Sequence, residues 1–141
     1  MDSGNRKEND LGYGPRLSDK EYERRIVELY SGLPRSPGRK VEEEVGRREL
    51  DLTIDHRLGQ DFPKERRDAL WDIQRRVEKK RLRLVLYWFT NFISYRWLHR
   101  RANKIAGYLV DEYAKVLTKD ELKAFFELRE DERPMLPIDR L

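Results

Sequence analysis

The sequence of 141 residues contains no cysteine. It therefore has no disulfide framework, no thiolate metal site and no thiol nucleophile. Long apolar runs are also missing, because the nearest approach, Leu84 to Tyr95, is twelve residues without a charge. A helix needs about 20 apolar residues to cross a bilayer. The first eight residues lack the apolar run of a signal peptide. These absences predict a cytoplasmic protein without a transmembrane segment.

Catalytic and cofactor-binding motifs are missing as well. The chain has no HExxH, GxGxxG, GxxxxGK[ST] or GxSxG pattern. Asp51, Asp55, His56 and His99 are of types that ligate metals, but a metal site needs three or four converging ligands. We expect these four to be ordinary surface residues. The sequence does not favour an enzyme, and we expect no cofactor and no metal.

Charge is abundant and unevenly spread. Charged residues make up 41% of the chain and apolar residues 38%, with a net charge of +4. This balance is typical of helices with a narrow apolar stripe and a broad solvated face. Between Phe62 and Lys104 there are thirteen Lys or Arg against four Asp or Glu, and the flanking segments are mildly acidic. The chain therefore has a basic band in its middle.

Local signals predict the first helices. Residues 1–16 have no periodic apolar pattern and are expected to form a disordered tail. Ser18 and Glu21 form a capping-box pattern that begins a helix over 18–31, which Gly32 ends. A second helix is expected over 40–58, although the alternation of Leu50, Leu52 and Ile54 leaves a strand, paired with its copy in a dimer, as an alternative.

The main prediction is one long amphipathic helix over 63–117. Its apolar residues keep a single face for some fifty residues, so we expect one helix or two nearly collinear helices. A straight helix of this length would extend about 80 Å, and it would need the first helices or a second subunit to lie along. Gly107, inside this helix, is expected to permit the close approach of another helix.

The remaining segments complete the predicted fold. Thr118 and Glu121 form a second capping-box pattern, which begins a helix over 119–129. Residues 131–141 contain two prolines and are expected to form an extended arm. The prediction is an all-α helical bundle in one domain, residues 17–130, organised on the long helix and completed by dimerisation.

An aromatic block in the long helix is the first candidate site. Its apolar residues point in nearly every direction around the helix, and all-round apolarity predicts all-round burial. The centre of a bundle or a dimer interface explains this best. A partner groove, a peripheral membrane contact and a small-ligand pocket are the alternatives. The candidate interface residues are Leu84, Trp88, Phe89, Phe92, Tyr95 and Trp97.

A basic patch flanks this block. It either contacts the phosphates of nucleic acid or anionic lipid, or it is a solvated face paired with the acidic clusters at 42–44 and 127–132. Arg81 lies near the apolar face, where we expect it to pair with an acid such as Glu28 or Glu49. The patch consists of Arg75, Arg76, Lys79, Lys80, Arg81, Arg83, Arg96, Arg100, Arg101 and Lys104.

The sequence thus favours a structural or protein–protein interaction module. The expected partners are a second copy of the chain, in a homodimer, and an unidentified protein. The alternative is a nucleic-acid-binding protein that uses the basic band from Arg75 to Lys104.

Overall fold

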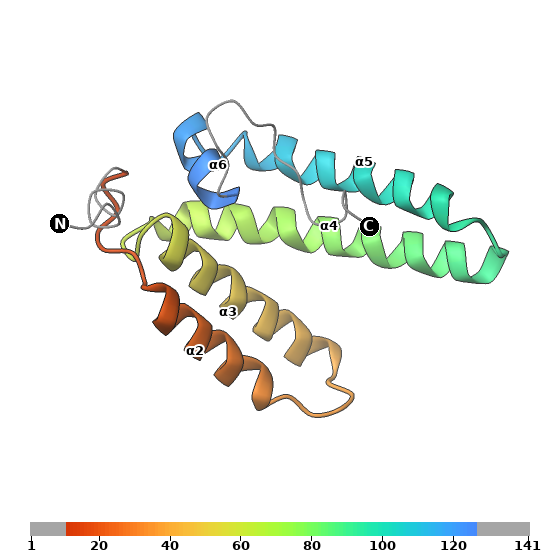
Figure 1. Ribbon diagram of the computed structural model, residues 1–141, viewed down its shortest axis with the longest axis horizontal. Helices are drawn as coiled ribbons and strands as arrows, with labels where there is room; N and C mark the ends of the chain where they lie inside the picture. Colours follow the sequence, from red (N-terminus) through yellow and green to blue (C-terminus); the bar gives the residue numbers. More distant parts are fainter. Residues whose placement is uncertain (1–10, 127–141) are drawn as a thin grey trace. The chain divides into compact units, whose positions relative to one another are not determined.

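The computed structural model describes residues 11–126, which form five helices and no strand (Figure 1). The all-α prediction is therefore confirmed for this part of the chain. The helices are α2 (Asp19–Ser31), α3 (Arg39–Arg57), α4 (Lys64–Asn91), α5 (Tyr95–Tyr113) and α6 (Lys119–Phe126). The strand alternative over residues 46–56 is wrong, because this segment lies within helix α3, on which Leu50 and Ile54 are one turn apart and both buried.

Two compact units make up the chain, and they divide between Arg67 and Asp68. The sequence predicts a single domain over 17–130, whereas the contacts group α2 and α3 in one unit and most of α4, α5 and α6 in the other. The predicted C-terminal arm lies outside the described residues.

The first unit is an antiparallel hairpin of α2 and α3. Contacts pair the start of α2 with the end of α3, as between Asp19 and His56, and the end of α2 with the middle of α3, as between Tyr30 and Glu49. Ser18 caps α2 by accepting a hydrogen bond from the Glu21 N–H at 3.1 Å. The buried apolar residues of this unit are Leu17, Leu50, Ile54, Leu58 and Phe62.

Residues 11–16 belong to this unit, although the sequence places them in a disordered tail. The Asp61 N–H donates to the Tyr13 carbonyl at 2.7 Å, and the Tyr13 ring packs edge-on against Phe62 at 4.8 Å. Gly59 permits this approach, since it has a φ of 135° and a Cβ there would collide with the Tyr13 carbonyl. Residues 1–10, the rest of the predicted tail, lie outside the described part of the chain.

The predicted long helix is two helices that fold back on each other. Helix α4 ends at Asn91, and α5 begins at Tyr95 with Ser94 as its N-cap. Tyr87 near the end of α4 contacts Trp97, and Gln74 accepts a hydrogen bond from the hydroxyl of Tyr113, so the pair is antiparallel (Figure 1). A hairpin buries the facing stripes of both helices, and an unbroken apolar phase therefore fits a reversal as well as a straight helix.

The buried residues of the second unit lie away from the turn of this hairpin. Tyr113, at the end of α5, packs against Phe125 of α6 at 5.3 Å, and burial raises the pKa of its phenol. The second capping box is confirmed in full, because Thr118 accepts from the Glu121 N–H at 3.2 Å while the Glu121 carboxylate accepts from the Thr118 N–H at 2.8 Å. The buried apolar residues are Leu70, Ile73, Val77, Ala102, Ala106, Leu109, Tyr113, Leu117 and Phe125.

Candidate functional site

The turn end of the α4–α5 hairpin exposes large apolar side chains. We call residues 82–95 the hairpin tip. Phe92 in the turn is 95% exposed, Phe89 is 72% exposed and Leu82 is 61% exposed. Val85, Leu86, Tyr87 and Tyr95 are also exposed. A contiguous exposed apolar surface on a small protein marks an interaction site, so the tip is the strongest candidate site in the described chain.

The predicted burial of the aromatic block does not hold within this chain. Leu84, Trp88 and Trp97 are half-buried, whereas Phe89, Phe92 and Tyr95 are exposed. Two helices that pack side by side cover only one face of each other. Because apolar residues surround this part of the helix on all sides, those on the outer faces remain in contact with solvent. The same composition that predicts burial therefore produces an exposed surface.

The turn that forms the tip contains a strained residue. Phe92 has a φ of 52°, which is the left-handed region that glycine and asparagine usually occupy. For any residue with a Cβ this conformation costs about 1–2 kcal/mol. The preceding turn is held by the Asn91 side-chain amide, which donates to the Tyr87 carbonyl at 2.9 Å. A bulky apolar side chain is thus held outward at the point where the chain reverses.

The charge around the tip has one sign. Between positions 79 and 110 the chain has eight Lys or Arg and no Asp or Glu. Some of these cations are engaged within the chain: Arg81 pairs with Glu78 at 2.9 Å, Lys80 lies over the Tyr108 ring, and Arg101 lies over the Trp97 ring. The partner of Arg81 is therefore a residue one turn away rather than Glu28 or Glu49.

Five further cations, Arg83 inside the tip and four others beside it, lack such partners among the described residues. We call Lys79, Arg83, Arg96, Arg100 and Lys104 the cationic collar. Among residues 11–126 none of them has an acidic group within ion-pair distance. All five are exposed. Within the described residues the collar therefore carries five cations without an acidic partner.

The two other arginines of the predicted patch lie on α4 farther from the turn. Arg76 pairs with Asp72 and Glu112, both at 3.4 Å, and Arg75 is exposed on the same helix. Glu112 has a lowered pKa because Lys115 donates to it at 2.6 Å and Arg76 adds a second hydrogen bond. This end of the hairpin is therefore internally paired, in contrast to the collar.

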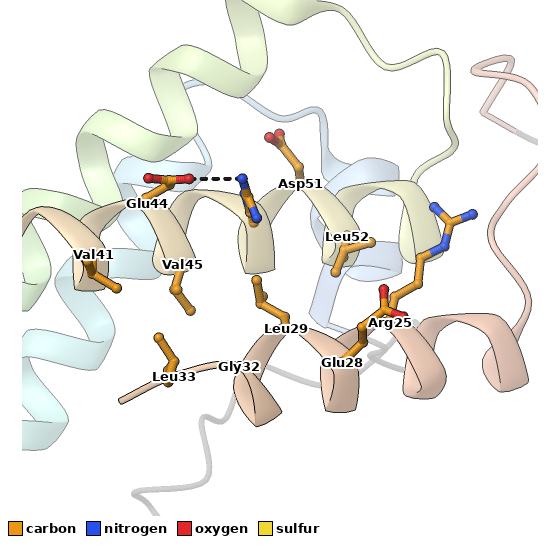
Figure 2. Close-up of a pocket in the computed structure, with 11 residues that line it drawn as sticks. Arg25, Glu28, Leu29, Gly32, Leu33, Val41, Glu44, Val45, Asp51 and Leu52 are labelled. Atoms are coloured by element: carbon orange, nitrogen blue, oxygen red, sulfur yellow. Dashed lines mark hydrogen bonds and ion pairs between the residues drawn. The ribbon is translucent and has the colours of Figure 1, made fainter. Parts of the chain in front are cut away.

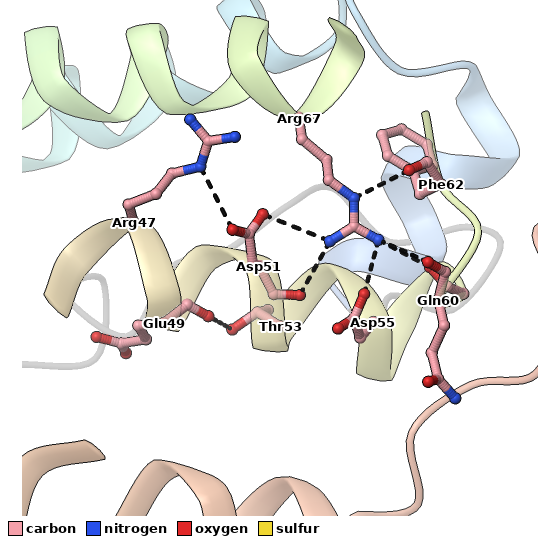
Figure 3. A network of polar contacts seen from close by, with 9 residues as sticks. Arg47, Glu49, Asp51, Thr53, Asp55, Gln60, Phe62 and Arg67 are labelled. Atoms are coloured by element: carbon pink, nitrogen blue, oxygen red, sulfur yellow. Dashed lines mark hydrogen bonds and ion pairs between the residues drawn. The ribbon is translucent and has the colours of Figure 1, made fainter. Parts of the chain in front are cut away.

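The acidic candidates for a metal site are engaged by an arginine instead. Figure 3 shows Arg67 at the centre of a polar network in the first unit. Its guanidinium lies 2.6 Å from an Asp55 carboxylate oxygen and 3.4 Å from Asp51, and it donates to the Phe62 and Gln60 carbonyls. Burial raises the pKa of Asp55, and Arg67 opposes that rise. The network fixes the first turn of α4 against α3.

The histidines are likewise engaged. His56 stacks on Tyr22 with ring centroids 4.4 Å apart and lies 2.6 Å from Asp19, while His99 stacks on Tyr95. No group of three potential metal ligands occurs among residues 11–126. The four candidate ligands therefore do not converge in the described structure.

A groove between α2 and α3 was not predicted from the sequence. It has a volume of about 680 Å³, and Figure 2 shows an apolar floor in which Leu29 and Leu33 face Val41 and Val45. Every charged residue on its rim already has a partner, as Arg48 does in Glu44 at 2.9 Å. The other paired rim residues are Arg25, Glu28 and Asp51. The groove offers no unpaired charge to orient a polar ligand, so it ranks below the tip.

Comparisons with known proteins identify no relative of this chain. The chain matches no protein-family model, no curated protein and no solved structure. Among the described residues, none of the helices combines the length and apolarity that crossing a membrane requires. The function must therefore be argued from the hairpin itself.

Proposed function

We propose that this protein is a non-catalytic interaction module whose binding surface is the hairpin tip with its cationic collar. One observation carries the proposal: the α4–α5 hairpin ends in exposed Phe89 and Phe92 rather than in polar residues. Burying each such side chain against a partner would contribute about 1.5–3 kcal/mol of binding free energy. A surface of this kind is typical of a binding site.

The predicted homodimer remains part of the proposal, although the tip is a poor place for it. A two-fold interface brings the same surface of each subunit together. Two tips in contact would juxtapose two collars, and like charges at an interface cost several kcal/mol. Self-association is therefore expected to use another surface. Sedimentation velocity tests this, since a tip variant such as Phe89→Ser should leave any dimer intact.

Nucleic-acid binding is the second candidate function. The collar cations, which have no acidic partner among residues 11–126, support it, because Lys and Arg that neutralise phosphates dominate affinity for nucleic acids. Exposed aromatic rings, such as those of Phe89 and Tyr95, would add stacking on unpaired bases. Labelled single-stranded RNA should then bind at low salt and be released steeply as salt rises. Absence of binding at low salt would remove this candidate.

Site-specific photo-crosslinking in the native cell tests the proposed surface. A photoreactive amino acid at Phe92 should form adducts with another molecule, whereas the same residue at Val27, which is 67% exposed on α2, should not. Equal adduct yields at both positions would show that the tip is not the binding surface.

A further inference from the structure

We infer that the partner of the hairpin tip is an anionic membrane surface, into which the tip inserts end-on. The inference rests on the proposed function, because it names the partner of the same surface. Its basis is the layering of side chains along the hairpin. Most exposed apolar residues lie at the turn or within two helical turns of it, and most of the collar lies farther along the two helices.

The depth of each layer matches the outer region of a bilayer. At about 1.5 Å per residue, Phe89 and Leu86 lie within about 3 and 8 Å of the end of α4. On the same scale Arg83, Arg100 and Lys104 lie about 8–14 Å from the turn, and Lys79 lies about 18 Å from it. Interfacial protein segments bury their apolar side about 5–10 Å into the boundary between headgroups and acyl chains. The apolar layer would therefore occupy that boundary while the collar reached the headgroup phosphates.

Arg96 is the one collar residue close to the turn, only one position into α5. Its long side chain can extend along the helix toward the headgroups, as arginines near membrane interfaces do. The exposed tyrosines, Tyr87 and Tyr95, also suit this depth, because an aromatic ring with a polar end favours the interface between lipid and water.

Two features favour lipid over the other anionic partners. Aliphatic side chains make up part of the tip, as at Val85 and Leu86, and they gain nothing from base stacking, whereas acyl chains would bury them. The exposed apolar residues also come from α4, the turn and α5, as Phe89, Phe92 and Tyr95 show, so an end-on approach covers them together. A second copy is disfavoured by the one-sided charge.

Vesicle co-sedimentation with the full chain tests the inference. Phosphatidylcholine vesicles with and without phosphatidylserine are compared. The protein should sediment with the anionic vesicles and stay largely in solution with the neutral ones. The charge variant Arg83→Gln/Arg96→Gln/Arg100→Gln should bind roughly 100-fold more weakly, because each cation near an anionic surface contributes about fivefold. The matched control Arg35→Gln/Arg39→Gln/Lys40→Gln removes the same charge from exposed positions in the first unit and should bind within a fewfold of wild type.

An apolar pair of variants tests insertion separately from charge. Phe89→Ser/Phe92→Ser should lose more than tenfold in affinity for each phenylalanine, whereas Val27→Ser, also at an exposed position, should bind like wild type. Circular dichroism is expected to be unchanged in all four variants, since every altered side chain is exposed. A blue shift of tryptophan emission on adding anionic vesicles should accompany binding, because Trp88 and Trp97 lie in the hairpin.

The inference is overturned if wild type ignores anionic vesicles, or if the tip variants bind them as well as their controls do. Binding of RNA or of an acidic peptide that depends on the tip, without vesicle binding, also overturns it and leaves the proposed function standing. If the photoreactive residue at Phe92 forms no adduct either, the proposed function fails with it.

Discussion

A substitution at Phe92 can measure the free-energy cost of the turn between α4 and α5 without any binding partner. Its left-handed backbone costs about 1–2 kcal/mol with any β-carbon present, and glycine removes that cost. Glycine also adds about 0.4–1 kcal/mol of conformational entropy to the unfolded chain. The side chain is 95% exposed, so its deletion forfeits only about 0.1 kcal/mol of burial. We therefore expect Phe92→Gly to stabilise the second unit by about 0.5–1 kcal/mol.

Urea denaturation followed by tryptophan fluorescence measures this change in the right unit. All three tryptophans, Trp71, Trp88 and Trp97, lie in the second unit, so the signal reports on it alone. The urea midpoint should rise without a change in slope, and the melting temperature should rise by roughly 2–5 °C. Phe92→Ala is the control, because alanine keeps the β-carbon and so the strain. It should stay within about 0.5 kcal/mol of wild type.

Two results would refute the reasoning. If Phe92→Gly lowered the free energy of unfolding, the phenylalanine ring would have to make packing contacts that its exposure denies. If glycine and alanine gave equal stabilities, the turn would not hold Phe92 in a left-handed conformation.

Three further changes test the two units. Arg67→Met should destabilise the first unit by about 2–3 kcal/mol at neutral pH, because it leaves the half-buried Asp55 carboxylate without its cation. Burial already raises the pKa of Asp55, so the native state binds that proton more tightly than the unfolded chain, and urea midpoints followed by far-UV circular dichroism should show the loss shrinking in acid. Gly107→Ala should stabilise α5 by about 1 kcal/mol in thermal denaturation, since nothing lies near the added methyl group. Thr118→Ala should cost about 1 kcal/mol, and an unchanged urea midpoint would contradict the capping box.

Signals confined to a few neighbouring residues were read correctly from the sequence. Ser18 and Thr118 each cap a helix as predicted, because a cap depends on a side chain and an N–H three residues away. At Ser18 the reciprocal half is missing. Glu21 instead binds Arg24 at 2.5 Å and Arg25 at 2.8 Å, and these hydrogen bonds lower its pKa to about 2. The Ser18 backbone N–H and the two arginines are all close to Glu21 in the sequence. Local spacing alone therefore does not decide which of them the carboxylate binds.

The reversal at 92–94 was missed because it lacks glycine and proline. The turn uses Phe92 in a left-handed conformation, where the usual sequence signal would be Gly or Asn. A weaker signal was present: Thr90, Asn91 and Ser94 are polar residues inside an otherwise apolar block. The Thr90 and Asn91 side chains bond to carbonyls of the preceding turn, and Ser94 caps the next helix at 3.3 Å from the Trp97 N–H.

The sequence predicts which residues make up the candidate site better than it predicts whether they are buried. The aromatic block and the basic residues were both identified, yet burial was expected where Phe89 and Phe92 are exposed. Periodicity indicates how many faces of a helix are apolar and leaves open which of them the chain itself can cover. The role of Gly107 was wrong for a related reason, because no helix approaches that face of α5 in the described structure.

The distribution of buried residues also bears on the dynamics of the hairpin. No residue from 78 to 101 is buried, whereas the segments farther from the turn supply Val77, Ala106 and Leu109 to the core. Opening the turn end therefore breaks backbone hydrogen bonds and exposes little new apolar surface. Amide hydrogens there should exchange by local opening, and those near Leu109 only by unfolding of the whole unit. A partner that covers the tip would slow this exchange, so protection factors along α4 and α5 would locate its boundary residue by residue.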